Sequence, residues 1–312
     1  MSDVDRSTSG LTTNIAMAHF EQFYPICDRR NRELANIYVS HADRNQPVFG
    51  TVYLMHGYGG SPVEPVMKVA MTDALACGFD VVAIEGVALS ATSGDAKRVT
   101  TMNLARQKRA LLRGIQYCND RSDLNHDYRI AWAHSMSCRA LSDLMVSSDL
   151  MRQYFHMAVL NNPYFLPPQR VQQAKAKLMQ RDPSGRLWQS VLHKSITQFR
   201  RIEDREYSFP TSLYNLTMPL PTSWCMDTNL PDLSERLSTF IHSDTRVSFV
   251  LGTDDNMAEY SQNVELFNGL RVPHKELHSI DGANHSFENA LDQYQTFTHR
   301  ILDNVRHTRG NF

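Results

Sequence analysis

Short apolar runs of strand length alternate with longer amphipathic segments along the first half of the chain, and this rhythm constrains the fold most. The predicted strands cover 51–55, 79–84, 128–133 and 155–160, and the predicted helices cover about 63–77, 101–119 and 136–148. The strands are almost continuously apolar, which is typical of parallel strands buried on both faces. Helix-length crossovers between them fit the same arrangement. The sequence therefore predicts the α/β class, with a mostly parallel sheet.

The rest of the chain divides into a second part of this core and an insertion. Residues 15–26 and 33–41 predict an antiparallel entry hairpin, and the strand pattern stops after Pro163 for about 80 residues. It returns over 246–251 and 274–280, before a terminal helix over 287–305. We therefore expect a core formed by 1–162 and 243–312, with an inserted helical cap over 163–242.

Ser135 lies where a predicted strand runs directly into a predicted helix. This is the place of a nucleophile elbow, a tight turn that needs small residues two before and two after an exposed serine. Ala133 and Ser137 hold those places, where glycine is usual. An ordinary helix N-cap serine is the alternative interpretation. Cys138 falls inside the helix, so we expect its sulfur to point away from the turn and exclude it as nucleophile.

Two later strands are each followed by a loop that carries a partner for this serine. Gly252-Thr-Asp-Asp-Asn-Met257 follows the first, and Asp281-Gly-Ala-Asn-His-Ser286 follows the second. The order serine, acid, histidine allows a triad in which the acid orients the imidazole and stabilises its protonated form. His285 is the predicted base. Asp254 and Asp255 both remain candidates for the acid on this reasoning.

The loop after the first core strand, His56-Gly-Tyr-Gly-Gly60, is rich in glycine. Such a loop lets backbone N–H groups turn toward the oxyanion that forms during acyl transfer. We assign this oxyanion hole to the backbone N–H groups of Tyr58 and Met136, the second being the residue after the nucleophile. His56 is expected to brace the loop, and His134 is expected to be packed or hydrogen-bonded and not to act as a base.

These motifs together resemble the α/β-hydrolase superfamily, in particular its lid-bearing esterases, lipases and acylglycerol-lipase-like serine hydrolases. The resemblance covers about residues 50–305 and is carried by HGYGG (56–60), AHSMSC (133–138), GTDD (252–255) and GANHSF (282–287). It departs from the superfamily at Ala133 and Ser137, and at 85–90, where D-x-R-G-x-G-x-S is common. The superfamily's G-x-x-D spacing selects Asp255 as the acid and leaves Asp254 to face solvent or to cap the following helix.

Composition and spacing limit the other functions. The chain has 312 residues, of which 32 are basic and 33 acidic, so its net charge of -1 gives no general attraction to nucleic acid or to an anionic membrane. No secretory signal and no run of about 18 apolar residues is found, so we expect a cytoplasmic protein with no transmembrane segment. The five scattered cysteines predict reduced, mostly buried thiols. Neither they nor the histidines show metal-site spacing, and no cofactor or metal is expected.

We interpret the chain as a serine hydrolase that cleaves a carboxylic ester or thioester through an acyl-enzyme on Ser135, with His285 and Asp255. The partner would be a small-molecule substrate with an apolar acyl group of medium or long chain length. The cap carries the aromatic residues Trp188, Tyr207, Phe209, Tyr214 and Trp224, which could line its pocket or could equally form a core of the cap itself. The same triad could cleave a carbon-carbon bond or transfer the acyl group to another acceptor, and a noncatalytic binding protein with this fold is a third alternative. The basic segment 198–205 contains acids and predicts a solvated helix face. The sequence leaves the oligomeric state open.

Overall fold

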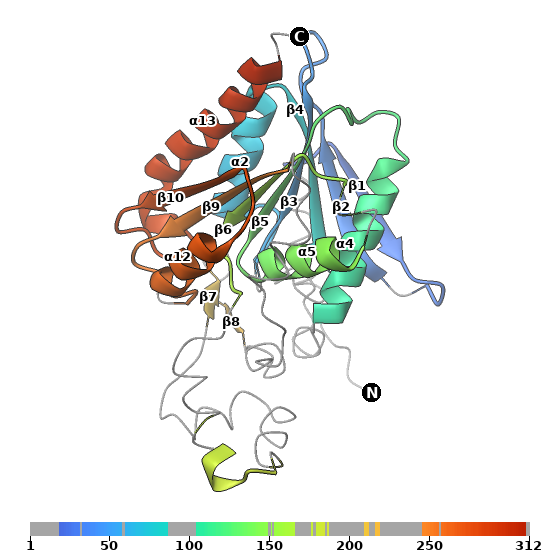
Figure 1. Cartoon of the computed structure of the whole chain (residues 1–312). Helices are drawn as coiled ribbons and strands as arrows, with labels where there is room; N and C mark the ends of the chain where they lie inside the picture. The colour runs from blue at the N-terminus through green and yellow to red at the C-terminus, as the bar shows by residue number, and fades with distance from the viewer. Residues whose placement is uncertain are drawn as a thin grey trace.

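An eight-stranded sheet forms the centre of the molecule, with helices on both of its faces (Figure 1). The computed structural model describes residues 19–31, 33–57, 60–86, 104–148, 151, 153–165, 176, 179–184, 186, 209–211, 216–218, 245–255 and 257–309. The strand order is β1-β2-β4-β3-β5-β6-β9-β10. The strands are β1 Gln22–Cys27, β2 Glu33–Ser40, β3 Gly50–Met55, β4 Phe79–Gly86, β5 Arg129–His134, β6 Met157–Asn161, β9 Arg246–Gly252 and β10 Lys275–Ile280. All neighbouring pairs from β4 to β10 are parallel, which confirms the predicted α/β class.

The helices divide between the two faces of the sheet because each parallel connection must cross over it. They are α2 Pro65–Ala76, α4 Leu104–Asn119, α5 Met136–Ser147, α12 Tyr260–Gly269 and α13 Leu291–Arg309, the last preceded by the 3-10 turn η2 Glu288–Ala290. Helices α2 and α13 pack together on one face, and α4 and α5 pack together on the other (Figure 1). Helix α12 joins the same apolar cluster as α4 and α5.

Alternate residues of the buried strands face the two helical layers. In β3, Val52 and Leu54 pack with α2 and α13, whereas Tyr53 and Met55 pack with α4 and α5. This two-residue period is the geometry of a pleated strand, and it explains why a strand between two layers is apolar throughout. The register aligns the chain so that β3, β5, β6, β9 and β10 all end at one edge of the sheet, which we call the carboxyl edge.

Most of the elements expected from the sequence are confirmed, and one expectation is wrong. The entry hairpin is present as β1 and β2, which pair antiparallel, and β2 also pairs antiparallel with β4. The expected absence of strands between 163 and 242 is wrong, because β7 Phe209–Thr211 pairs antiparallel with β8 Leu216–Met218. Each has three residues, and Pro210 interrupts the first, so neither shows a readable alternation. Most of the proposed cap over 163–242 lies outside the described residues.

Candidate active site

Ser135 occupies a strained turn between β5 and α5 at the carboxyl edge. Its φ is 55° and its ψ is -122°, a backbone conformation that costs a non-glycine residue about 1 to 3 kcal/mol. The turn is fixed by its neighbours, because the Ser135 N–H donates to the carbonyl of Asn161 and the Ser135 carbonyl accepts from the N–H groups of Cys138 and Tyr164. Strain held in this way is typical of a functional turn and is not required of a helix cap, and the Ser135 side chain makes no hydrogen bond that caps α5.

A continuous hydrogen-bond chain joins the three predicted side chains. His285 Nε2 lies 2.8 Å from Ser135 Oγ, and His285 Nδ1 lies 2.8 Å from Asp255 Oδ2. The carboxylate can only accept, so Nδ1 carries a proton and Nε2 is left free to accept from the serine hydroxyl. The structure therefore brings Ser135, His285 and Asp255 together from the ends of β5, β10 and β9.

Asp255 is held in its charged form by the groups around it. Its burial alone would raise its pKa, but the charge and hydrogen bond of His285, with the N–H groups of Ala258 and Met257, keep the pKa below the ordinary value. Asp255 Oδ1 accepts from these two N–H groups at 2.9 and 2.7 Å. The capping role that we expected for Asp254 is therefore performed by Asp255, because the turn from Gly252 directs the Asp255 carboxylate inward, and Asp254 is exposed.

The small residues on either side of Ser135, Ala133 and Ser137, make different hydrogen bonds. Ala133 is fully buried, and its carbonyl accepts from the side-chain amide of Asn161 at 2.8 Å. Ser137, which stands where glycine is usual, donates its hydroxyl to the backbone carbonyl of His56 and thereby ties α5 to the glycine-rich loop after β3. At Gly57, an added Cβ would lie 2.9 Å from the Cβ of Ser135, so only glycine lets this loop approach the serine so closely.

Of the two expected oxyanion donors, the structure describes Met136 and does not describe Tyr58. Met136 is the first residue of α5. The N–H groups in the first turn of a helix have no acceptor within that helix, so the Met136 N–H is one of these. It directly follows Ser135, at the positive end of the helix dipole. Tyr58 lies outside the described residues, and its assignment remains a prediction from the sequence.

The buried His134 pairs with the partly exposed Glu64 next to His285. His134 Nε2 donates to the carbonyl of His285 at 2.9 Å, and its Nδ1 lies 3.4 Å from Glu64 Oε1. Burial lowers the pKa of His134, but Glu64, the His285 carbonyl and the charge of Asp255 outweigh it and raise the pKa above its usual value. His134 is thus packed and hydrogen-bonded, as expected. Cys138 is also buried as expected, and burial raises the pKa of its thiol well above the ordinary value.

Sequence reasoning missed Glu64 and the pair Asn161 and Asn162 at the end of β6. Asn162 accepts from the N–H of Gly252 and donates to the carbonyls of Asn284 and His285. The available signal was two adjacent asparagines at the exit of a strand that neighbours the predicted nucleophile strand. Side chains at the carboxyl ends of neighbouring parallel strands meet, so this pair could have been added to the predicted site.

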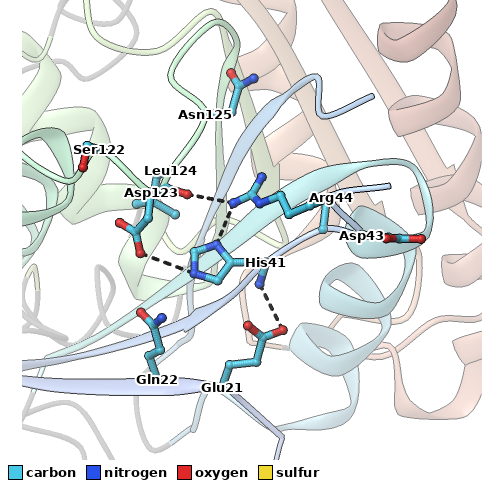
Figure 2. Close-up of a pocket in the computed structure, with 10 residues that line it drawn as sticks. Glu21, Gln22, His41, Asp43, Arg44, Ser122, Asp123, Leu124 and Asn125 are labelled. Atoms are coloured by element: carbon cyan, nitrogen blue, oxygen red, sulfur yellow. Dashed lines mark hydrogen bonds and ion pairs between the residues drawn. The ribbon is translucent and has the colours of Figure 1, made fainter. Parts of the chain in front are cut away.

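A second polar cluster lies at the opposite edge of the sheet, beside a cavity of about 860 Å³ (Figure 2). We call it the amino-edge cluster: His41, Arg44, Asp80 and Asp123. His41 Nε2 lies 3.4 Å from Asp123 Oδ2, and its Nδ1 accepts from Arg44 at 2.8 Å. Buried Asp80 accepts from the N–H groups of Ala42 and Asn125 and from Arg44. Ser122 also lines the cavity but lies apart from His41 in Figure 2, so this histidine does not activate it.

The described residues also bear on metals, thiols and membranes. No three or more His, Cys, Asp or Glu side chains among them are placed to hold a metal ion. Their four cysteines are free thiols, of which Cys77, Cys118 and Cys138 are buried and Cys27 is exposed. No helix in the described part of the chain is both long enough and apolar enough to cross a bilayer.

Comparisons with known proteins find likeness in structure and none in sequence. No protein-family model and no curated protein sequence matches the chain. The fold is similar to that of a thermostable carboxyl esterase from Bacillus coagulans, with a TM-score of 0.66 and 12% identity over 92% of this chain and 98% of that one. A soluble variant of monoglyceride lipase from Saccharomyces cerevisiae gives 0.62 and 13% over 91% and 94%, and Est1E from Butyrivibrio proteoclasticus gives 0.61 and 12% over 90% and 97%.

Proposed function

The chain has the α/β-hydrolase fold, and from this premise we propose that it is a serine hydrolase that cleaves carboxylic esters. The observation that carries the proposal is the chain of two 2.8 Å hydrogen bonds from Asp255 through His285 to Ser135. The strained backbone of Ser135 adds to it. Two of the solved structures named above are a carboxyl esterase and a monoglyceride lipase, which supports ester hydrolysis as the reaction.

In the proposed reaction, His285 Nε2 takes the proton of Ser135 as Oγ attacks the acyl carbon of the ester. The oxyanion of the tetrahedral intermediate accepts hydrogen bonds, and Asp255 stabilises the imidazolium. Collapse of the intermediate expels the alcohol, which receives its proton from His285. Water then attacks the acyl-enzyme and gives one proton to His285, which returns it to Ser135 as the acid leaves. Each proton taken by His285 is thereby given back within one turnover.

The oxyanion donors of the proposal are the N–H groups of Met136 and Tyr58. Met136 is supported by its place directly after Ser135 at the start of α5. Tyr58 is supported by its place in the chain, because it directly follows Gly57, which approaches Ser135 closely. One such donor contributes about 10² to 10³-fold to kcat in serine hydrolases of known mechanism.

An apolar acyl group is the proposed substrate feature, and the segment 163–242 is the proposed cap that encloses it. Its aromatic residues supply apolar surface, and an apolar pocket gains about 0.8 kcal/mol for each methylene that it buries. The value of kcat/KM is then expected to rise over the first several acyl carbons and to level off when the pocket is filled. A steady decrease from the acetyl ester onward would contradict an apolar pocket.

The experiment that tests the proposal is a screen of p-nitrophenyl esters and matching thioesters of graded acyl length, run beside Ser135→Ala. The wild-type protein should hydrolyse at least one ester, and Ser135→Ala should lose about 10³-fold or more of kcat while its circular dichroism spectrum is unchanged. Product analysis by mass spectrometry should find free acid and alcohol. Equal turnover by the two proteins would refute the role of Ser135.

A further inference from the structure

The side chain of Asn162 lies between the two loops that carry Asp255 and His285. Asn162 follows β6 directly, is 1% exposed, and has a φ of 39°, a left-handed conformation that asparagine tolerates better than most residues. Its backbone N–H donates to the carbonyl of Val250 in β9 at 2.8 Å. The backbone is thus fixed to the neighbouring strand, and the amide side chain is directed toward the triad loops.

Both ends of this amide are used, and they reach different loops. Its Oδ1 accepts from the N–H of Gly252 at 2.8 Å, the residue that ends β9 and lies three positions before Asp255. Its Nδ2 donates to the carbonyls of His285 at 2.8 Å and of Asn284 at 3.1 Å. A single buried side chain therefore connects the backbone of the acid loop with the backbone of the histidine itself.

The neighbouring residues repeat this arrangement for the nucleophile. The carbonyl of Asn161 accepts from the Ser135 N–H at 2.9 Å, and its side chain donates to the carbonyl of Ala133. The carbonyl of His285 receives a second hydrogen bond from His134, the residue before Ser135. Consecutive residues of one strand exit thus hold all three members of the chain Ser135, His285 and Asp255.

We infer that Asn162 is a positioning residue, which sets the distance between the imidazole of His285 and both of its partners by fixing the acid loop against the histidine loop. The inference rests on the proposed function, for which this geometry matters. Asn162 touches no reacting atom, so it acts only through the residues that it holds. The effect can be large, because a misplacement of about 1 Å in a catalytic group can lower a rate about 100-fold.

The variant Asn162→Asp tests this with little change of shape. One carboxylate oxygen can still accept from Gly252, while the other replaces a donor and faces two carbonyls, so the link to the histidine loop is lost. The chain offers a matched control in Asn125→Asp, at the opposite edge (Figure 2). There Oδ1 accepts from the N–H of Asp127 at 2.8 Å and Nδ2 donates to the carbonyl of Val48 at 2.8 Å.

Steady-state kinetics on the best ester of the screen give the first reading. Asn162→Asp should lower kcat about 10 to 100-fold and change KM by less than about threefold, because the alignment of the triad is altered and the substrate contacts are not. Asn125→Asp should keep kcat within about twofold of wild type, even if its melting temperature falls as much as that of Asn162→Asp. A kcat of Asn162→Asp within about twofold of wild type would overturn the inference and leave Asn162 a purely structural residue.

A proton NMR reading separates this inference from the proposed function. The proton shared by His285 Nδ1 and Asp255 should give a low-field resonance in the wild-type protein, assigned by its loss in His285→Gln. The resonance should move or disappear in Asn162→Asp and stay in place in Asn125→Asp, and an unmoved resonance in Asn162→Asp would overturn the inference. This holds even if no ester is hydrolysed, which would refute only the proposed function. If Asn162→Asp fails to fold, Asn162→Gly accepts the same φ, removes the links to both loops and is judged by the same two readings.

Discussion

The two edges of the sheet both carry a histidine beside a carboxylate, but the two histidines have different surroundings. At the carboxyl edge, His285 joins the carboxylate of Asp255 to Ser135, whose backbone is strained and whose hydroxyl bonds the imidazole. At the amino edge, His41 joins the carboxylate of Asp123 to Arg44, and Asp80 accepts from two backbone N–H groups. The groups that this histidine contacts are also paired with their neighbours, because Arg44 donates to Asp80 and Asp123 accepts from Arg121.

The comparison shows that a histidine beside a carboxylate does not identify an active site. The two edges differ in the number of non-glycine residues with an unfavourable, positive φ. Among the described residues, four non-glycine residues have a positive φ, and three of them are Ser135, Asn162 and Phe287, all in the loops of the carboxyl edge. Such strain is tolerated where the surrounding hydrogen bonds determine the conformation, and it collects at functional sites.

The largest expected effect is the loss of kcat when Asp255, the proposed acid of the carboxyl edge, is replaced. Asp255→Asn should lower kcat about 10² to 10⁴-fold, because an amide in this place favours the wrong tautomer of His285. Asp254→Asn is the matched control, since its side chain is exposed and one residue away. It should leave kcat within about twofold and the free energy of unfolding within about 0.5 kcal/mol. Ester kinetics of both variants check this, and the opposite order would transfer the role to Asp254.

At the amino edge we expect an effect on stability alone. Asp80→Asn should lower the free energy of unfolding by about 1 to 3 kcal/mol, because one of the buried N–H donors of Ala42 and Asn125 or the guanidinium of Arg44 loses its acceptor. The value of kcat should stay within about twofold at a temperature where the variant is folded. Urea unfolding and ester kinetics measure the two quantities. A kcat that falls more than tenfold would mean that the edges are coupled.

A smaller effect is expected where the elbow meets the glycine-rich loop. Ser137→Ala removes the hydroxyl that donates to the carbonyl of His56, and it should cost about 1 kcal/mol of stability. Ser142 offers a matched control, as a second buried serine of α5, farther from the elbow. Ser137→Ala should also lower the rate of fluorophosphonate labelling, whereas Ser142→Ala should not. Equal labelling rates would show that this hydrogen bond does not position the loop.

The smallest effect concerns the pH dependence of stability. The folded-state pKa of His134 is raised above its unfolded value of about 6.5. Its protonation therefore contributes fully to the free energy of unfolding below that pH, and this contribution is lost as the pH rises through the raised pKa. Glu64→Gln removes a group that raises this pKa. The difference in unfolding free energy between wild type and Glu64→Gln should therefore be greatest below pH 6 and shrink at alkaline pH. A difference that grows with pH would contradict the pairing of Glu64 with His134.

Sequence patterns were sufficient for the elements that repeat a period. Six core strands and the crossover helices were predicted within a few residues, because buried parallel strands are apolar throughout and the helices between them are long. The places of Ser135 and His285 followed from the same pattern, since Ser135 directly follows a strand and His285 lies in the short loop after another. The hairpin of β7 and β8 was not predicted, because three residues are too few to show a period.

The parts that escaped prediction depend on contacts between distant segments. The choice of Asp255 over Asp254 as the residue that caps Met257 depends on how the turn after β9 closes, which local sequence does not encode. Asn162 bonds residues about 90 and 123 positions away, and its partners are backbone groups that carry no sequence signal. Glu64 approaches His134 only after α2 and β5 have packed.

The most direct test of Ser135 as the nucleophile is covalent labelling with a fluorophosphonate, followed by peptide mapping in a mass spectrometer. The strained serine with a histidine at 2.8 Å should react, so we expect one phosphonate per chain, located on Ser135. Labelling should be abolished in Ser135→Ala and should persist in Ser122→Ala, whose serine lies at the amino edge. An unlabelled protein, or a phosphonate found on Ser122, would contradict the claim that the carboxyl edge holds the reactive site.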